Sequence, residues 1–252
     1  MVKLQPLTID DARCLYTDAD SVHDFDHILR VLALAERIAR AEDADLDIVR
    51  TATLLHDWGR GEADADRQDH AAVAVGRARD FLTSQGHPSA WIEAVVHAIA
   101  AHRFRVAPEP ATLEARVLFD ADKLDAIGAI GVARAFAYGG AHQQRLWAPM
   151  ADVDLARWET NGDDAAHTPV HEFVVKLSRI RERLYTDEGR AIALERHRYM
   201  EAFYHRLDAE VQGLLYENKK PEGIAPPAFC AKFNHASAGE DKGARRGSCG
   251  DR

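Results

Sequence analysis

Histidine and aspartate residues that could bind a metal ion are concentrated in the first half of the sequence. Six of the 13 histidines lie between residues 27 and 102: His27, His56, His70, His87, His97 and His102. His56 precedes Asp57 in "LLHDWG", and Asp122 stands in "DADKLD". Imidazole nitrogen together with carboxylate oxygen suits Mn²⁺, Fe²⁺, Co²⁺, Ni²⁺ or Zn²⁺, and suits Mg²⁺ less well. Metal chemistry is therefore the first hypothesis for these residues.

A structural role for the same residues is the competing hypothesis. A histidine on the apolar face of a helix is more often a hydrogen-bonded core residue than a ligand. A His–Asp pair on its own is not diagnostic, and Asp122 could pair with a nearby arginine. The spacing alone leaves a metal site and a structural role equally open.

Three separate predicted helices would position the candidate ligands. Apolar residues at 3.6-residue spacing predict an amphipathic helix over 21–42, which carries His27 in its first turns. A second helix, capped by Asp45, ends at His56 and Asp57, and a long helical pattern over 113–140 contains Asp122. Since each candidate borders an apolar stripe, the three helices could bring them together in the core of a bundle.

The rest of the chain completes an all-α prediction with a single domain. Asp69 is expected to cap one further helix, and Pro88 to lie in the first turn of another. We expect a lead-in over 1–20, a core carrying the ligands over 21–138, and a flap followed by C-terminal helices over 139–216. The aperiodic, Gly- and Lys-rich segment 217–252 is expected to be a disordered tail.

Composition excludes several classes of partner. A net charge of -9 argues against proteins that bind nucleic acid duplexes or anionic membranes through a basic face. No apolar run approaches the 18 or so residues of a membrane span, and the three widely separated cysteines form no metal or disulfide motif. We therefore expect a cytoplasmic protein that acts on a small molecule; the oligomeric state stays open.

The ordered motifs resemble a known superfamily. "HDFDHILRVLALA", "LLHDWG" and "DADKLDAIGAIGVARAF" give the order H…HD…D, which is similar to that of the HD-domain metal-dependent phosphohydrolases. The likeness covers about residues 20–215. It is strongest to a small bacterial branch, some members of which act as nucleotide pyrophosphohydrolases. The resemblance implies a helical HD-domain bundle and hydrolysis of a phosphoester or phosphoanhydride.

The resemblance also implies which residues hold the metal. It assigns His27, His56, Asp57 and Asp122 as ligands, with Mn²⁺ the preferred ion among Co²⁺, Ni²⁺, Fe²⁺, Zn²⁺ and Mg²⁺. Asp120, two residues before Asp122, faces elsewhere on a helix, whereas Asp125 at i+3 could support the ligands.

Two further histidines, His70 and His102, are expected at the same site. They occupy positions where dinuclear relatives hold a second ion, with Asp57 bridging the two. In mononuclear relatives the same positions line the substrate phosphates, and both assignments stay open.

The implied reaction is attack of a metal-activated water on phosphorus, with Asp57, His70 and His102 as the catalytic candidates. A nucleotide is the expected substrate, and Arg30, Lys123 and Lys176 could contact its phosphates, although solvated surface charge is the alternative role for all three. Two other functions remain open: a di-iron HD-type oxygenase and a non-catalytic nucleotide-binding module. The sequence does not distinguish phosphate from pyrophosphate release.

Overall fold

The computed structural model describes residues 6–16, 25–60, 69–103, 107–150 and 167–214. Every regular element within these ranges is helical, which confirms the all-α prediction. The predicted tail falls outside the described residues. A short helix, α1 (Ile9–Arg13), precedes the others and is closed at its start by a capping box between Thr8 and Asp11.

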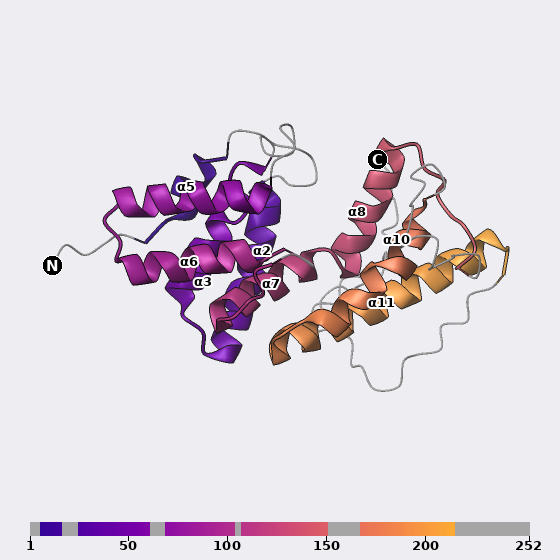
Figure 1. Ribbon diagram of the computed structural model, residues 1–252. Helices are drawn as coiled ribbons and strands as arrows, with labels where there is room; N and C mark the ends of the chain where they lie inside the picture. The colour runs from indigo at the N-terminus through magenta and orange to yellow at the C-terminus, as the bar shows by residue number, and fades with distance from the viewer. Residues whose placement is uncertain (1–5, 17–24, 61–68, 104–106, 151–166, 215–252) are drawn as a thin grey trace, which may run out of the picture. The chain divides into compact units, whose positions relative to one another are not determined.

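Five helices build the N-terminal part of the main hydrophobic core, to which the later helices also contribute. They are α2 (Phe25–Glu42), α3 (Leu46–Leu55), α5 (His70–Ser84), α6 (Ser89–Ala101) and α7 (Leu113–Asp125). The predicted caps at Asp45 and Asp69 are confirmed, because each side chain accepts hydrogen bonds from backbone N–H groups of the first turn. Pro88 lies one position earlier than predicted, as the N-cap of α6. In Figure 1 these helices gather together, and α7 contacts α2, α3 and α6.

The long helix predicted over 113–140 is wrong, because the structure divides it in two. Helix α7 ends at Asp125, and α8 (Gly128–Ala141) begins after Ile127, whose backbone is extended. Gly128 has a φ of +77°, a left-handed conformation that glycine adopts without steric cost. The break ends α7 just beyond Asp122 and lets α8 leave in a new direction (Figure 1).

The C-terminal helices pack on the α7–α8 region. They are α10 (Pro169–Val175), the 3₁₀ helix η2 (Leu177–Arg183) and α11 (Asp187–Val211), which contacts both α7 and α8. Part of the predicted flap is helical, since α8 reaches Ala141. Trp147 donates a hydrogen bond from Nε1 to Asp208 on α11 at 3.2 Å, so it packs on the helices. Residues 151–166 of that flap lie outside the described ranges.

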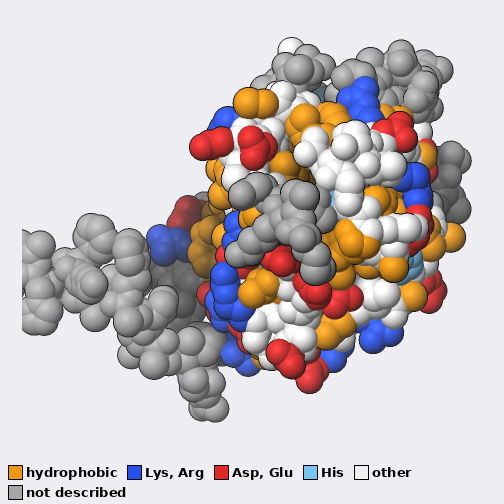
Figure 2. All heavy atoms as spheres, turned by 90° about the vertical axis from the view of Figure 1, so that its left-hand side faces the viewer, with side chains coloured by type: hydrophobic (Ala, Val, Ile, Leu, Met, Phe, Trp, Pro, Cys, Tyr) orange, Lys and Arg blue, Asp and Glu red, His pale blue; other side chains and the backbone are white. Residues whose placement is uncertain are grey.

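One face of the molecule is mixed in charge and polarity (Figure 2). Figure 2 shows acidic and basic side chains interspersed with apolar and uncharged ones on one face. Within the described residues no helix is long and apolar enough to cross a membrane.

Candidate metal centre

The end of α3 delivers the His–Asp pair into the core. Helix α3 stops at Leu55, His56 is its C-cap, and Asp57 stands in the turn that Gly59 closes with a φ of +91°. Both side chains are buried: His56 is 0% exposed and Asp57 is 3% exposed. An ionised carboxylate so deeply buried requires compensating positive charge nearby.

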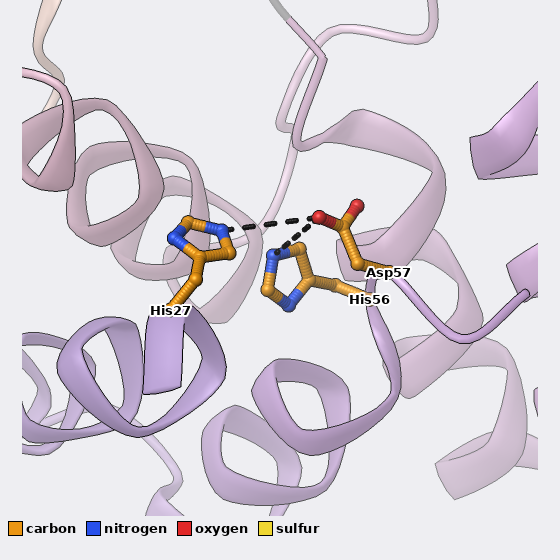
Figure 3. A group of neighbouring side chains, drawn as sticks. All are labelled: His27, His56 and Asp57. Atoms are coloured by element: carbon orange, nitrogen blue, oxygen red, sulfur yellow. Dashed lines mark ion pairs between the residues drawn. The ribbon is translucent and has the colours of Figure 1, made fainter. Parts of the chain in front are cut away.

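His27 on α2 meets this pair. Its Nε2 atom lies 3.8 Å from Oδ2 of Asp57, and Nε2 of His56 lies 3.8 Å from the same oxygen (Figure 3). These separations exceed hydrogen-bond lengths. Because one ligand atom from each of the three residues lies within 4.8 Å of the others, the group could share one ion.

Hydrogen bonds on the far side of each ring orient these imidazoles. Nδ1 of His27 lies 2.8 Å from Oδ2 of Asp125, and Nδ1 of His56 lies 2.7 Å from the backbone oxygen of Thr53. Neither oxygen carries a proton to donate when Asp125 is ionised, so each Nδ1–H must be the donor. The Nε2 atoms then face Asp57, which is the orientation found in metal-binding histidines.

The nitrogen and oxygen atoms that face one another at this site suit a bound cation. Within the described residues, Nε2 of His56 is buried and has no hydrogen-bond partner. An unsatisfied polar atom in a protein core costs about 1–3 kcal/mol. A cation among the Nε2 atoms and Oδ2 of Asp57 would satisfy this nitrogen and offset the carboxylate charge.

Asp122 borders the same group from α7. Its Oδ1 atom lies 3.4 Å from Nε2 of His27, while its Oδ2 atom accepts a 2.5 Å hydrogen bond from Lys123. Asp120 faces away and binds the start of α11, and Asp125 holds His27. The expected directions of Asp120 and Asp125 are therefore confirmed. Whether Asp122 ligates the ion stays a prediction.

A second group of possible metal ligands also includes Asp57. His102 is the C-cap of α6, and its Nε2 lies 3.8 Å from Oδ1 of Asp57, the oxygen that does not face His27. Its Nδ1–H donates to the backbone oxygen of Ile99 at 2.6 Å. His70, the first residue of α5, completes a candidate group with Asp57 and His102. The two carboxylate oxygens of Asp57 thus face two different sets of histidines.

The charges of the metal-free site divide the histidines into two kinds. Burial lowers the pKa of His27, but Asp122 and Asp125 outweigh it and raise that pKa to about 9. Burial and the neighbouring His56 lower the pKa of His102 to about 3, so His102 is neutral at pH 7. Burial also opposes ionisation of Asp57, yet His56 and Arg60 hold its pKa well below the usual range.

One cation at this site was missed by the sequence analysis. Arg60 donates from Nη1 to both oxygens of Asp57, at 3.0 and 3.3 Å. Its position three residues after Asp57 was the available signal, because the turn after α3 brings i and i+3 together. Lys123, the predicted phosphate contact on α7, has a side chain only 15% exposed and bound to Asp122, so it is not a solvated surface charge.

The other two predicted phosphate contacts lie elsewhere. Arg30 donates to Asp125 from Nε at 2.8 Å and from Nη2 at 3.1 Å, so it reaches His27 only through that carboxylate. Lys176 donates to Glu172 at 2.7 Å. Within the described residues, no contact joins Lys176 to the candidate ligands. Phosphate binding by either residue stays untested.

Comparison with known proteins identifies the family. The HD domain model matches residues 24–127. The uncharacterised protein YpgQ of Bacillus subtilis is 35% identical over 204 residues, which is 79% of this chain and 90% of YpgQ. The structure of YpgQ in complex with ADP aligns with a TM-score of 0.61 at 32% identity and covers 82% of this chain and 99% of YpgQ.

A second solved structure supports the same assignment. An HD-superfamily hydrolase from Bacillus thuringiensis aligns with a TM-score of 0.62 at 29% identity, covering 81% of this chain and 94% of that protein. The matched segment contains His27, His56, Asp57 and Asp122. The chain belongs to the HD-domain metal-dependent phosphohydrolase superfamily.

Proposed function

We propose that this protein is a divalent-metal-dependent phosphohydrolase that acts on a nucleotide. The observation that carries the proposal is the convergence of the Nε2 atoms of His27, His56 and His102 on the buried carboxylate of Asp57. Such a mixed nitrogen and oxygen set is typical of catalytic sites that hold Mn²⁺ or a similar ion.

His27, His56, Asp57 and Asp122 would hold the ion. A bound divalent cation supplies Lewis-acid stabilisation of phosphoryl charge and a water of lowered pKa. The protein residues orient these groups: Asp125 and the backbone oxygen of Thr53 fix the two imidazole rings.

Two positively charged side chains beside the proposed metal ligands could bind a polyanionic substrate. Arg60 and Lys123 each contact one carboxylate of the site, Asp57 and Asp122 respectively. Both would lie at the edge of a bound ion, where guanidinium and ammonium groups stabilise negative charge on phosphate oxygens. An acidic chain can therefore accept a nucleotide at this one place.

His70 and His102 have two possible roles in the proposed reaction. Because Oδ1 of Asp57 faces His102, a second ion shared with Asp57 is one role. Contact of both rings with the substrate phosphates is the other. Metal content after reconstitution separates them, since two ions per chain support the first role and one ion supports the second.

The choice of a nucleotide is supported by a relative. The YpgQ structure determined in complex with ADP shares 32% identity with this chain across nearly all of YpgQ. We carry only the ligand class to this protein. Base, sugar and the position of cleavage are what the assay must determine.

The test is hydrolysis of nucleoside mono-, di- and triphosphates with Mn²⁺, Co²⁺, Ni²⁺ or Mg²⁺ after chelation, with products separated to distinguish phosphate from pyrophosphate. We expect His56→Gln and Asp57→Asn each to lower kcat by at least about 10³-fold, because each removes a ligand. Asp26→Asn, an exposed aspartate beside His27, is the matched control and should retain activity.

Unchanged turnover in both ligand variants would disprove the proposal. Two iron ions per chain with substrate-dependent oxygen uptake would instead support an oxygenase. Tight nucleotide binding without turnover under every metal would support a non-catalytic module.

A further inference from the structure

A rigidly held pair of aromatic rings lies beside α7. Phe119 is 5% exposed and Tyr185 is 39% exposed, and their ring centroids are 5.1 Å apart at an interplanar angle of 82°. Phe119 is therefore largely covered, whereas Tyr185 is exposed, with the guanidinium of Arg116 over its ring at 6.0 Å from the centroid. An exposed aromatic ring packed edge-on by another ring has few alternative positions.

A buried carboxylate fixes the backbone under Tyr185. Asp120 is 0% exposed and accepts hydrogen bonds from the backbone N–H of Tyr185 at 2.9 and 3.1 Å. It also accepts from the N–H of Thr186 at 2.7 Å and from its hydroxyl at 2.6 Å. The segment between η2 and α11 is thus tied to α7, the helix that carries Asp122.

The aromatic pair is linked to the metal centre through Lys123. Its Nζ atom lies 5.4 Å from the centroid of the Phe119 ring, within the range of a cation–π contact, and donates to Asp122 at 2.5 Å. Phe119 and Lys123 are four residues apart and so share one face of α7. Phe119, which packs on Tyr185, therefore lies one turn of α7 from Lys123 and Asp122 of the metal centre.

A cavity of about 550 Å³ opens beside these rings. Its lining includes Phe119, Tyr185, Arg103, Arg183, Glu109 and Glu182. Two arginines and two glutamates leave the lining formally neutral, with both donors and acceptors. Arg103 directly follows His102 of the candidate centre. Such a lining suits an uncharged, planar, hydrogen-bonding group better than a polyphosphate.

A second cavity, of about 940 Å³, is lined from α1, α3 and the turn between α5 and α6. No candidate metal ligand lines either cavity. The 550 Å³ cavity is distinguished by Phe119, which lines it and whose ring contacts Lys123, the partner of Asp122.

We propose that the cavity between α7 and the η2–α11 connection binds the nucleoside part of the substrate, with the base stacked on Tyr185 and its phosphates directed past Lys123 to the metal centre. This inference rests on the proposed function. In this proposal α7 contributes to both parts of the substrate site. Asp122 and Lys123 lie where the phosphates would bind, while Phe119 and Asp120 hold Tyr185 where the base would stack.

The test compares two ligands that differ by the nucleoside. Calorimetry measures the affinity of ADP and of inorganic pyrophosphate for the full-length protein with Mn²⁺, in wild type, Tyr185→Leu and Tyr185→Phe. Stacking on an aromatic ring contributes about 1–3 kcal/mol per base, which corresponds to about 5- to 150-fold in affinity. We expect Tyr185→Leu to weaken ADP binding by that factor and to change pyrophosphate binding by less than about twofold.

Two controls separate the cavity from folding. Tyr185→Phe keeps the ring and should bind ADP as wild type does, and Tyr199→Leu, which removes an exposed tyrosine of α11 outside the cavity, should do the same. Equal loss of ADP and pyrophosphate binding in Tyr185→Leu, or no loss of either, would overturn the inference. Hydrolysis is followed separately by product analysis, so an absence of hydrolysis would refute the proposed function while a selective loss of ADP binding would still support the cavity.

Discussion

Helix α7 contributes to two buried polar clusters that differ in how completely their hydrogen bonds are formed. Asp120 accepts four hydrogen bonds of 2.6–3.1 Å from Tyr185 and Thr186. In the other cluster, Asp57 is 3.8 Å from each of three imidazole nitrogens, and Nε2 of His56 has no partner among the described residues.

This difference suggests how to distinguish a buried carboxylate that stabilises the fold from one that binds a ligand. A buried carboxylate with a full set of donors ties distant segments of the fold together, although burial still outweighs the hydrogen bonds at Asp120 and raises the pKa of that carboxyl. In the other cluster Asp57 accepts from Arg60, but the imidazole nitrogens around it lie too far away to bond it, so this site gains stability when a cation enters. The first cluster should therefore be needed for folding and the second for ion binding.

The largest expected effect comes from exchanging the two carboxylates for amides. Asp120→Asn places an N–H group among donors and should lower the free energy of unfolding by about 2–4 kcal/mol, while leaving Mn²⁺ affinity nearly unchanged. Asp57→Asn should also lower the stability of the metal-free protein, by about 1–3 kcal/mol, because it removes a buried charge that Arg60 and the neighbouring histidines favour. Urea unfolding with and without Mn²⁺ measures both.

The ion supplies the decisive readout for this pair of variants. At 100 times its Kd, Mn²⁺ should add about 2.7 kcal/mol to the stability of wild type and of Asp120→Asn, and almost nothing to Asp57→Asn. If Asp120→Asn loses the metal response and Asp57→Asn keeps it, the distinction between the clusters is wrong.

An intermediate case sharpens the comparison. Asp125 is 1% exposed and fully engaged, like Asp120, but one of its partners is the candidate ligand His27. The others are Arg30 and Arg134, the latter at 3.2 Å. Asp125→Asn should lower Mn²⁺ affinity by about 10- to 100-fold, because the amide no longer fixes Nδ1–H of His27 as the donor.

Calorimetric titration of Mn²⁺ checks this effect, and Asp26→Asn is again the control. An Mn²⁺ affinity equal to that of wild type would show that Asp125 serves only the fold.

The sequence predicted correctly those features that depend on residues close together in the chain. Helical periodicity and caps placed α2 and α3, and the 3.6-residue turn correctly separated the directions of Asp120, Asp122 and Asp125. The His–Asp pair became meaningful only with partners on other helices, and the order of motifs supplied them.

The rest depended on contacts between segments far apart in the chain. Tyr185 stands 65 residues after Asp120, and no spacing rule relates the two. The break between α7 and α8 was missed because Gly128 and the small residues around it also fit the helical period. The ligand assignment itself remains a prediction.

The smallest expected effect tests a third engaged carboxylate away from α7. Glu172 on α10 accepts hydrogen bonds from His167 at 3.2 Å and from Lys176 at 2.7 Å. Burial opposes its ionisation, but these two partners outweigh burial and lower the pKa of Glu172 to about 2. A carboxyl whose pKa is lower when folded stabilises the protein above its ordinary pKa, and that contribution fades as the pH falls from about 4.5 towards 2.

Glu172→Gln should therefore lower the free energy of unfolding by about 1–2 kcal/mol at pH 7, a value reduced by partial exposure of the pair, and by progressively less below pH 4.5. Glu210→Gln removes an ion pair with Arg206 in which both side chains are more than half exposed, and should cost less than about 1 kcal/mol. Urea unfolding at pH 7, 5, 4 and 3 distinguishes the two. A cost for Glu172→Gln that does not change with pH would mean that lost packing, and not the charge of an engaged carboxylate, stabilises α10; the rule drawn from Asp120 would then not extend beyond α7.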